Sequence, residues 1–279
     1  MSYERLRDDS DYGGPRWKPD TIDLERPSQA RIYDYVLGGA HNFAVDRQVA
    51  EQVLAAYPDM RTSVYANRAF LRRTVLFLVE AGIRQFLDIG SGIPTVGHVH
   101  DIAQGAAFES RVAFVDIDPI AVAHSRDILR GNDRTAVIEQ DVRNPEAILE
   151  HPDLQRLLDL DEPIAVLVVA LFHFIPDADD PVDILSRLTA PLPSGSYLAI
   201  SHLTDDGIHD MDQLRQISGR AGIQGVPRGR RQVKALFGEF QIVEPGLVWV
   251  PQWRPESPDD LYLDRPEASG VYAGVGRKP

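Results

Sequence analysis

The stretch Phe86-Leu-Asp-Ile-Gly-Ser-Gly-Ile-Pro-Thr95 decides the fold of this chain. A short apolar run ends at Asp88, and Gly90 and Gly92 follow with one residue between them. Glycine adopts the left-handed backbone conformations of tight turns, and its lack of a side chain lets a ligand approach the backbone closely. The stretch therefore predicts a strand that runs into a ligand-binding turn.

Short apolar runs alternate with helical patterns from this point onward. Strands are predicted for residues 84–89, 111–117, 135–140, 164–172 and 195–202. Helices are predicted for 95–104, 119–129, 211–221 and 232–237, and also after the pairs Asn144-Pro145 and Asp180-Pro181. Such alternation is typical of a parallel sheet with helices on both faces. The last runs, 241–250 and 269–277, have no helix between them and are predicted to pair antiparallel at one edge.

Three further helices are predicted before the sheet. The first begins after Pro27-Ser28 and ends at Gly38-Gly39, and the other two cover residues 46–57 and 62–81. Residues 1–26 are polar and show no periodicity, so we expect a mobile or wrapped arm. The predicted organisation is an arm at 1–26, a helical cap at 27–82 and a core that contains the sheet at 83–279.

Composition argues against several classes of protein. The 279 residues include no cysteine and no histidine pair with ligand spacing, so we expect no metal site. The formal charge of −13 disfavours nucleic acid as a partner, and the basic stretch Val226–Arg231 is interpreted as a solvated loop. No apolar run approaches the roughly 18 residues of a spanning helix, and the N-terminal stretch has no signal-peptide pattern. We therefore expect a cytoplasmic protein that does not enter the membrane.

The ends of the first four strands carry acids, amides or small residues. These ends read Asp88-Ile-Gly-Ser-Gly92, Asp116-Ile-Asp118, Gln140-Asp-Val142 and Ala170-Leu-Phe-His173. Ligands of open parallel sheets bind outside the carboxyl ends of the strands, at the topological switch point. The candidate binding residues therefore lie at these four strand ends.

A dinucleotide is the first ligand to consider, because Gly90, Gly92 and an acid on the second strand belong to its fingerprint. Position 95, however, is Thr instead of the third glycine, and Pro94 removes one backbone N–H from the turn. Asp88 would also place a negative charge beside a diphosphate. These features argue against a nicotinamide-dependent oxidoreductase.

A ligand with an ammonium group, a ribose and an adenine, but without phosphate, fits these residues better. Asp88 can face the cation, directly or through water, and the glycines allow an amino-acid group to approach. Asp116 can accept hydrogen bonds from both ribose hydroxyls. Asp141 can accept from the adenine amine, near the Val142 N–H, although a cap of the following turn is a competing role for this acid. The ligand with these groups is S-adenosylmethionine (SAM).

The same residues resemble the motifs of class I SAM-dependent methyltransferases. More narrowly, residues 27–47, 65–73 and 84–95 resemble the bacterial DUF574 family of S-adenosyl methyltransferases, and the likeness extends from about Pro27 to the end. The resemblance implies SAM as cofactor, S-adenosylhomocysteine (SAH) as product, and a Rossmann-like sheet of seven strands in the order 3-2-1-4-5-7-6 with strand seven antiparallel. Pro94 departs from the class, where many members have a third glycine.

The candidate cofactor contacts form one set on the strand ends and a second set in the cap. The strand-end set is Asp88, Gly90, Ser91, Gly92, Asp116, Ile117, Asp141, Val142 and Ala170, and the cap set is Tyr33, His41, Asn42 and Arg68. The cap set is expected to close the pocket and exclude water, although plain packing is the alternative for Tyr33. Arg68 can hold the SAM carboxylate in a bidentate pair, or it can be a surface arginine. Asp118 is expected only to cap the next helix.

Three more side chains have open roles. His173 follows the fourth strand, where this class often places residues that face the transferred methyl group, and it can orient a substrate, act as a base or serve the loop. Trp249 and Trp253 can line a substrate pocket or belong to the core and its rim.

The expected activity is methyl transfer by in-line displacement to an oxygen or nitrogen of a small-molecule acceptor. The alternative is a SAM-binding sensor or regulatory module without turnover, because no motif such as Asn-Pro-Pro-Tyr follows the fourth strand. The sequence predicts neither the acceptor nor the oligomeric state.

Overall fold

The computed structural model describes residues 25–93, 97–206, 211–223, 225–260 and 262–279. The arm expected at residues 1–26 lies almost wholly outside these ranges, as do Pro94 and Thr95. No helix within the described ranges is long and apolar enough to cross a bilayer.

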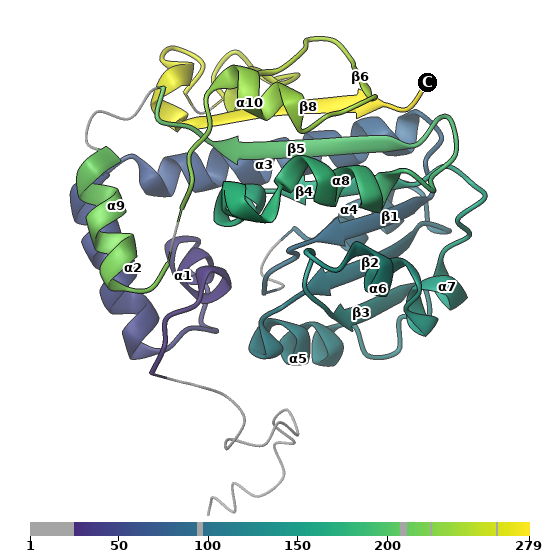
Figure 1. The fold of residues 1–279 in the computed structure, drawn as a ribbon, viewed down its shortest axis with the longest axis horizontal. Helices are drawn as coiled ribbons and strands as arrows, with labels where there is room; N and C mark the ends of the chain where they lie inside the picture. The colour runs from purple at the N-terminus through teal and green to yellow at the C-terminus, as the bar shows by residue number, and fades with distance from the viewer. Residues whose placement is uncertain (1–24, 94–96, 207–210, 224, 261) are drawn as a thin grey trace, which may run out of the picture.

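A single mixed sheet forms the centre of the protein (Figure 1). The strands are β1 (Gln85–Ile89), β2 (Arg111–Asp116), β3 (Thr135–Glu139), β4 (Ala165–Val169), β5 (Tyr197–Leu203), β6 (Gln241–Ile242), β7 (Val248–Trp249) and β8 (Val271–Arg277). Their order is β3-β2-β1-β4-β5-β8-β6, with β7 also paired to β8. Strands β1–β5 are parallel, and β8 runs antiparallel to β5, β6 and β7. The predicted strand order is confirmed, and the two-residue strand β7 is an addition to it.

Helices cover both faces of this sheet. The α-helices after β1 are α4 (Val99–Ala106), α5 (Pro119–Ile128), α6 (Pro145–Leu149), α7 (Pro152–Leu157), α8 (Pro181–Thr189), α9 (Met211–Arg220) and α10 (Arg230–Ala235), with the 3-10 turn η2 (Phe172–Phe174) after β4. Alternate residues of β4 enter different apolar clusters, Val166 and Val168 on one face and Ala165 and Leu167 on the other. A strand buried on both faces explains the nearly uninterrupted apolar run of the sequence.

The predicted cap of α5 is confirmed. One carboxylate oxygen of Asp118 accepts hydrogen bonds from the backbone N–H groups of Ile120 and Ala121, and Pro119 occupies the first helical position. Ser28 stands at the N-cap of the first helix, but its hydroxyl donates to the other oxygen of Asp118 instead of to its own helix. This contact fastens the first helix beside the end of β2.

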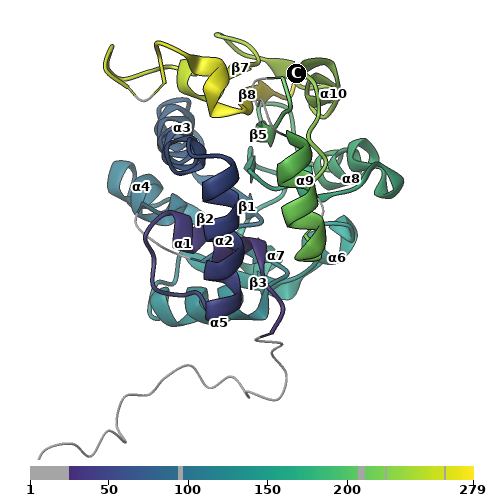
Figure 2. The same cartoon turned by 90° about the vertical axis from the view of Figure 1, so that its left-hand side faces the viewer.

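Three helices and the first turns of a fourth lie over the carboxyl ends of the parallel strands: α1 (Gln29–Val36), α2 (Ala44–Ala56), α9 and the start of α3 (Met60–Glu80). The rest of α3 packs on one face of the sheet. Figure 2 shows α2 and α9 side by side, and the two helices are in contact. A separate small apolar cluster joins Ile32, Val49 and Val64 of α1, α2 and α3 to Ile223, which lies in the segment after α9. Helices from opposite ends of the chain therefore share one covering layer.

Candidate active site

A cavity of about 520 Å³ lies between the strand ends and this covering layer. Twelve of the fourteen candidate residues line it: Tyr33, Arg68, Asp88, Gly90, Ser91, Gly92, Asp116, Ile117, Asp141, Val142, Ala170 and His173. Ten of them come together because the parallel strands β1–β4 end at one edge of the sheet, while Tyr33 comes from α1 and Arg68 from α3. This volume lies within the range typical of small-molecule sites.

Two backbone hydrogen bonds hold the carboxylate of Asp116. One oxygen accepts the backbone N–H of Gly92 at 2.7 Å, and the other accepts that of Asp118 at 2.8 Å. Burial raises the pKa of Asp116, and these backbone hydrogen bonds oppose the rise. A carboxylate has about four lone-pair sites. Two sites therefore stay available for donors such as a pair of ribose hydroxyls.

Asp88 lies deeper, between a cation and a second acid. Burial raises the pKa of Asp88 to about 7, the charge of Arg68 opposes this rise, and the Asp116 carboxylate adds to it. A cationic group that enters the cavity beside Asp88 would favour the ionised carboxylate. Asp88 is thus suited to an ammonium ligand and unsuited to a phosphate.

The turn after β1 requires its two glycines. Gly90 and Gly92 have φ values of +69° and +67°, in the left-handed region. A Cβ on Gly90 would also lie 2.7 Å from the Leu171 side chain. Opposite this turn, Ala170 has a φ of +56°, a costly conformation for a residue with a Cβ. Both strand ends therefore turn sharply at the cavity.

Asp141 has a different environment from Asp116. Burial favours a higher pKa, but hydrogen bonds from the Arg143 side chain and backbone outweigh it and lower the pKa of Asp141. The carboxylate is partly exposed, and Arg143 also approaches Asp179. This ion pair was not expected from the sequence, and it leaves Asp141 ionised at the rim of the cavity.

His41 and Asn42 do not line the cavity. The Asn42 side chain donates to Asp34 at 2.8 Å and to the Gly39 carbonyl at 2.9 Å, and the His41 backbone N–H also donates to Asp34. The His41 ring packs edge-on against His124. A Cβ on Gly39 would lie 2.0 Å from an Asp34 oxygen. These residues shape the loop after α1, and the cap contributes Tyr33 and Arg68 to the lining instead.

Asn67 is a lining residue that the sequence analysis missed. Its amide N–H donates to the Tyr33 hydroxyl at 3.1 Å, while its buried Oδ1 has no hydrogen-bond partner among the described residues. An unpaired buried carbonyl costs about 1–3 kcal/mol. A ligand donor that reached this oxygen would remove the cost. The signal in the sequence was Asn67 itself, a polar residue on the buried face of a long helix.

The hydrogen bonds around His173 and His202 define their neutral forms. A carbonyl only accepts, so His202 Nδ1 donates to Leu203 O, and its Nε2 accepts from Arg228. The Leu203 N–H only donates, so His173 Nδ1 accepts it at 3.5 Å and Nε2 carries the proton. Burial, followed by the charges of His202 and Arg228, lowers the pKa of His173 well below its usual value. His173 is therefore arranged as a hydrogen-bond donor and poorly suited to be a base.

The interpretation of Val226–Arg231 as a solvated loop is wrong. Arg228 is only 2 % exposed, and it donates to the carbonyls of Phe172 and Ile175 and to the carboxylate of Asp177. Arg230 already belongs to α10. Because a guanidinium has five N–H groups, one arginine can donate to several carbonyls at once. The charge of the stretch 226–231 alone does not indicate these partners, because they are distant in the sequence.

The two tryptophans do not line the cavity. Trp253 is fully buried and contacts the rings of Phe70 and Phe77, while Trp249 stacks on Tyr272 with ring centres 4.2 Å apart. They belong to the core and its rim.

Comparisons with known proteins agree with this geometry. A crystal structure of a proposed methyltransferase from Thermobifida fusca YX has 39% sequence identity and a TM-score of 0.88, covering 94% of this chain and 99% of that one. A DUF574 family protein from Streptomyces avermitilis MA-4680 has 39% identity and a TM-score of 0.88, covering 92% and 99%. An O-methyltransferase family protein from Burkholderia thailandensis shares only the fold, with 11% identity, a TM-score of 0.50 and coverage of 83% and 62%. Among curated proteins, none matches significantly.

The model of the family described as S-adenosyl methyltransferase matches residues 15–279. This match spans the cap, the glycine turn and all the strand ends that line the cavity. It confirms SAM as the cofactor, in preference to a dinucleotide. The chain therefore belongs to the S-adenosyl methyltransferase family, the DUF574 group of SAM-dependent enzymes.

Proposed function

We propose that the cavity holds SAM across the ends of β1, β2 and β3 and transfers its methyl group to an oxygen or nitrogen of a small-molecule acceptor. The observation that carries the proposal is the placement of Asp88, Asp116 and Asp141 at three neighbouring strand ends that line one cavity. In addition to its partners in the protein, each acid would then face one group of the cofactor: Asp88 the ammonium, Asp116 the ribose, and Asp141, which also pairs with Arg143, the adenine amine. Ile117 and Val142 would contact the adenine, and Arg68 would hold the carboxylate.

When bound, SAM supplies an activated methyl carbon: its bond to sulfur breaks with the electron pair on sulfur, the new bond to oxygen or nitrogen forms, and the acceptor's proton leaves to water. The protein's own residues then have three tasks. The strand ends orient the cofactor, the covering helices exclude water, and His173 donates a hydrogen bond that orients the acceptor. A strong base is not part of this scheme, because His173 Nδ1 is already occupied by the Leu203 N–H.

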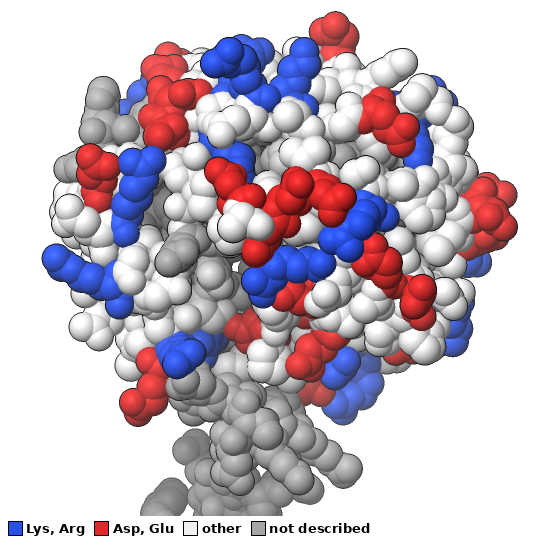
Figure 3. Space-filling model, viewed as in Figure 1, with Lys and Arg blue, Asp and Glu red and all other residues white. Residues whose placement is uncertain are grey.

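Two features support a small-molecule acceptor: the position of the cavity beneath the covering helices and the charge of the protein. The site lies under helices rather than on an open surface. Acidic and basic side chains are interspersed on the face shown in Figure 3, and the whole chain has a net charge of −13. Such a surface offers little attraction to a phosphate backbone. We place the reaction in the cytoplasm, away from nucleic acids and membranes.

The test begins with calorimetric titration of SAM, SAH and NAD, and continues with detection of SAH formed in the presence of candidate acceptors. We expect SAM and SAH to bind with one site per chain and NAD not to bind. Binding of NAD alone, or of none of the three, would overturn the proposal. Binding of SAM without turnover of any acceptor in a broad panel would support the sensor instead.

A further inference from the structure

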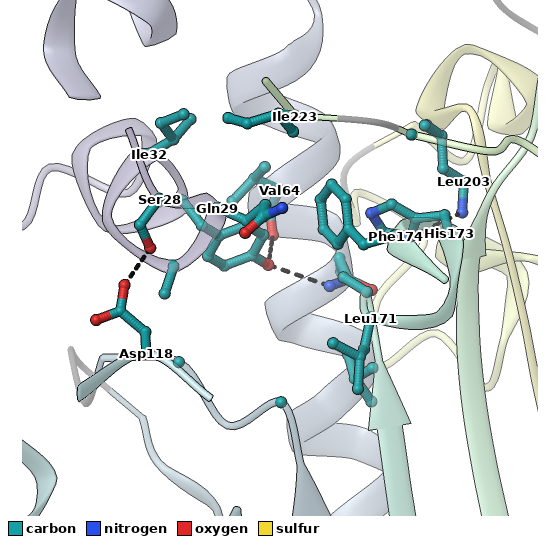
Figure 4. Close-up of a pocket in the computed structure, with 18 of the residues that line it drawn as sticks. Ser28, Gln29, Ile32, Val64, Asp118, Leu171, His173, Phe174, Leu203 and Ile223 are labelled. Atoms are coloured by element: carbon teal, nitrogen blue, oxygen red, sulfur yellow. Dashed lines mark hydrogen bonds between the residues drawn. The ribbon is translucent and has the colours of Figure 1, made fainter. Parts of the chain in front are cut away.

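The cavity changes its chemistry from its floor to its roof. The floor consists of the strand ends with their acids and glycines. The roof consists of α1, α2, α3, η2, α9 and the chain on either side of α9. Most of its lining is apolar, with Ile32, Val64, Phe174, Leu203, Met211 and Ile223 facing the cavity. Figure 4 shows Ile32 and Ile223 close together above Val64 and Phe174. The amino-acid group and the ribose of SAM account for the polar floor, but they do not account for the apolar lining of the roof.

The apolar residues of the roof are not fully used by packing within the protein. Ile32, Val64 and Ile223 form a buried cluster, but Leu37, Met60 and Phe174 are only partly buried against it. Leu214 of α9 is also half-buried, and it lines the same cavity. Protein interiors are normally close-packed, so apolar side chains around an open space indicate room for an apolar ligand.

Three charged side chains of the roof line the cavity: Arg68, Arg215 and Asp34. Arg68 is assigned to the SAM carboxylate in the proposed function, and Arg215 of α9 already pairs with Asp205 and Asp212. Asp34 receives the donors of the loop after α1 on one oxygen, and its other oxygen is buried beside Gly39, with no hydrogen-bond partner among the described residues. A charged acceptor would therefore lose its hydration without gaining a counter-ion from these groups.

Polar side chains also line the cavity, among them Gln29, Tyr33, Ser63, Asn67, His173 and Ser218, and two of them have buried groups suited to orient an acceptor. The Asn67 Oδ1 atom has no partner, and the neutral His173 ring carries a proton on Nε2. One acceptor and one donor are enough to orient a single hydroxyl or N–H group. They do not provide the many polar contacts that a sugar or a peptide requires.

We propose that the methyl acceptor is an uncharged, mainly apolar small molecule with one hydroxyl or N–H group, seated under α9 against Ile32, Val64 and Ile223. This inference rests on the proposed function, in which SAM occupies the floor. The helices of the roof select the acceptor by excluding charge, and Asn67 positions its polar group.

The test uses two fluorescent probes with the same ring system, neutral N-phenyl-1-naphthylamine and its sulfonated analogue 8-anilino-1-naphthalenesulfonate. Each is titrated into the SAH-saturated protein at about 0.15 M salt, which screens the overall negative charge. We expect saturable binding of the neutral probe with one site per chain, at least tenfold tighter than binding of the sulfonate. Equal binding of both probes, or no binding of the neutral one, would overturn the inference.

Substitutions of residues in the roof test where the neutral probe binds. Ile223→Asp and Leu214→Asp should each weaken binding of the neutral probe at least tenfold, and the half-buried position of Leu214 makes its variant the safer one for folding. Val182→Asp is the matched control, because Val182 is an exposed apolar residue on α8, away from the cavity, and should change nothing. SAH affinity, measured on the same samples, should stay unchanged in all three. Loss of the probe in the Val182 variant as well would contradict the assigned location.

The same measurements separate the two proposals. Failure of the unmodified protein to bind SAH would contradict the proposed function, whatever the probes do. Normal SAH binding combined with a preference for the sulfonated probe would contradict only the neutral, apolar acceptor.

Discussion

The floor and the roof of the cavity are built in opposite ways. The floor is polar, and backbone hydrogen bonds stabilise it: the N–H groups of Gly92 and Asp118 donate to the Asp116 carboxylate. The roof is apolar and held by packing between helices from distant parts of the chain, such as α1 and the segment that contains Ile223. The difference indicates that cofactor recognition is encoded locally, whereas acceptor recognition depends on tertiary packing.

The largest expected effect concerns Arg228, the buried arginine that donates to the carbonyls of Phe172 and Ile175 in and beside η2. Arg228→Met should lower the free energy of unfolding by about 3 kcal/mol, because it leaves the buried carbonyls of Phe172 and Ile175 without donors. For a chain of this size, that loss corresponds to a fall of about 5 °C in Tm. Arg231→Met is the control, because Arg231 is exposed on α10 and should leave Tm nearly unchanged. Equal effects of both variants would mean that the buried contacts contribute little.

The next effect concerns the floor. Asp116→Ala should weaken SAH binding by about 100-fold, because two hydrogen bonds to a charged acceptor and the position of Gly92 are lost together. Calorimetry measures this change, and Asp133→Ala, which removes a highly exposed acid far from the cavity, should have no effect. An unchanged affinity in the Asp116 variant would break the assignment of the floor to the cofactor.

Arg68 tests whether the covering helices, which form the roof, also help to bind the cofactor. Arg68→Ala should weaken SAH binding by about 30-fold, the value of a bidentate pair with the ligand carboxylate. Arg72 lies one turn further along α3, is half-exposed and pairs with Glu256, so Arg72→Ala is a matched control that should have less than about a twofold effect. If the two variants behaved alike, the carboxylate would be bound elsewhere.

The smallest effect is a pH dependence. The raised pKa of Asp88, about 7 in the free protein, means that a cationic ligand must displace a proton at lower pH. SAH affinity should therefore fall about tenfold from pH 8 to pH 6 and level off above pH 8. In Asp88→Asn this slope should disappear. A slope that persisted in the variant would have to come from another group.

The sequence predicted most of the fold and the floor because both depend on short-range patterns. The apolar run of β4 reflects burial on both faces of a strand, and the acid and glycines after β1 reflect the turn in which they lie. His41 and Asn42 looked equally suitable in sequence, yet the hydrogen bonds to Asp34 keep them in the loop after α1. Arg228, Asn67 and Ile223 were missed because their roles depend on partners far away in the chain.

The two backbone N–H groups that hold Asp116 have a consequence for speed as well as affinity. A side chain that must be immobilised during binding costs about 0.5–1.5 kcal/mol, and here that ordering has already occurred in folding. An incoming ribose therefore meets a carboxylate of fixed direction, and each productive collision needs fewer rearrangements. We therefore expect the cofactor to bind to a pre-organised ribose site, with little induced fit of the Asp116 side chain.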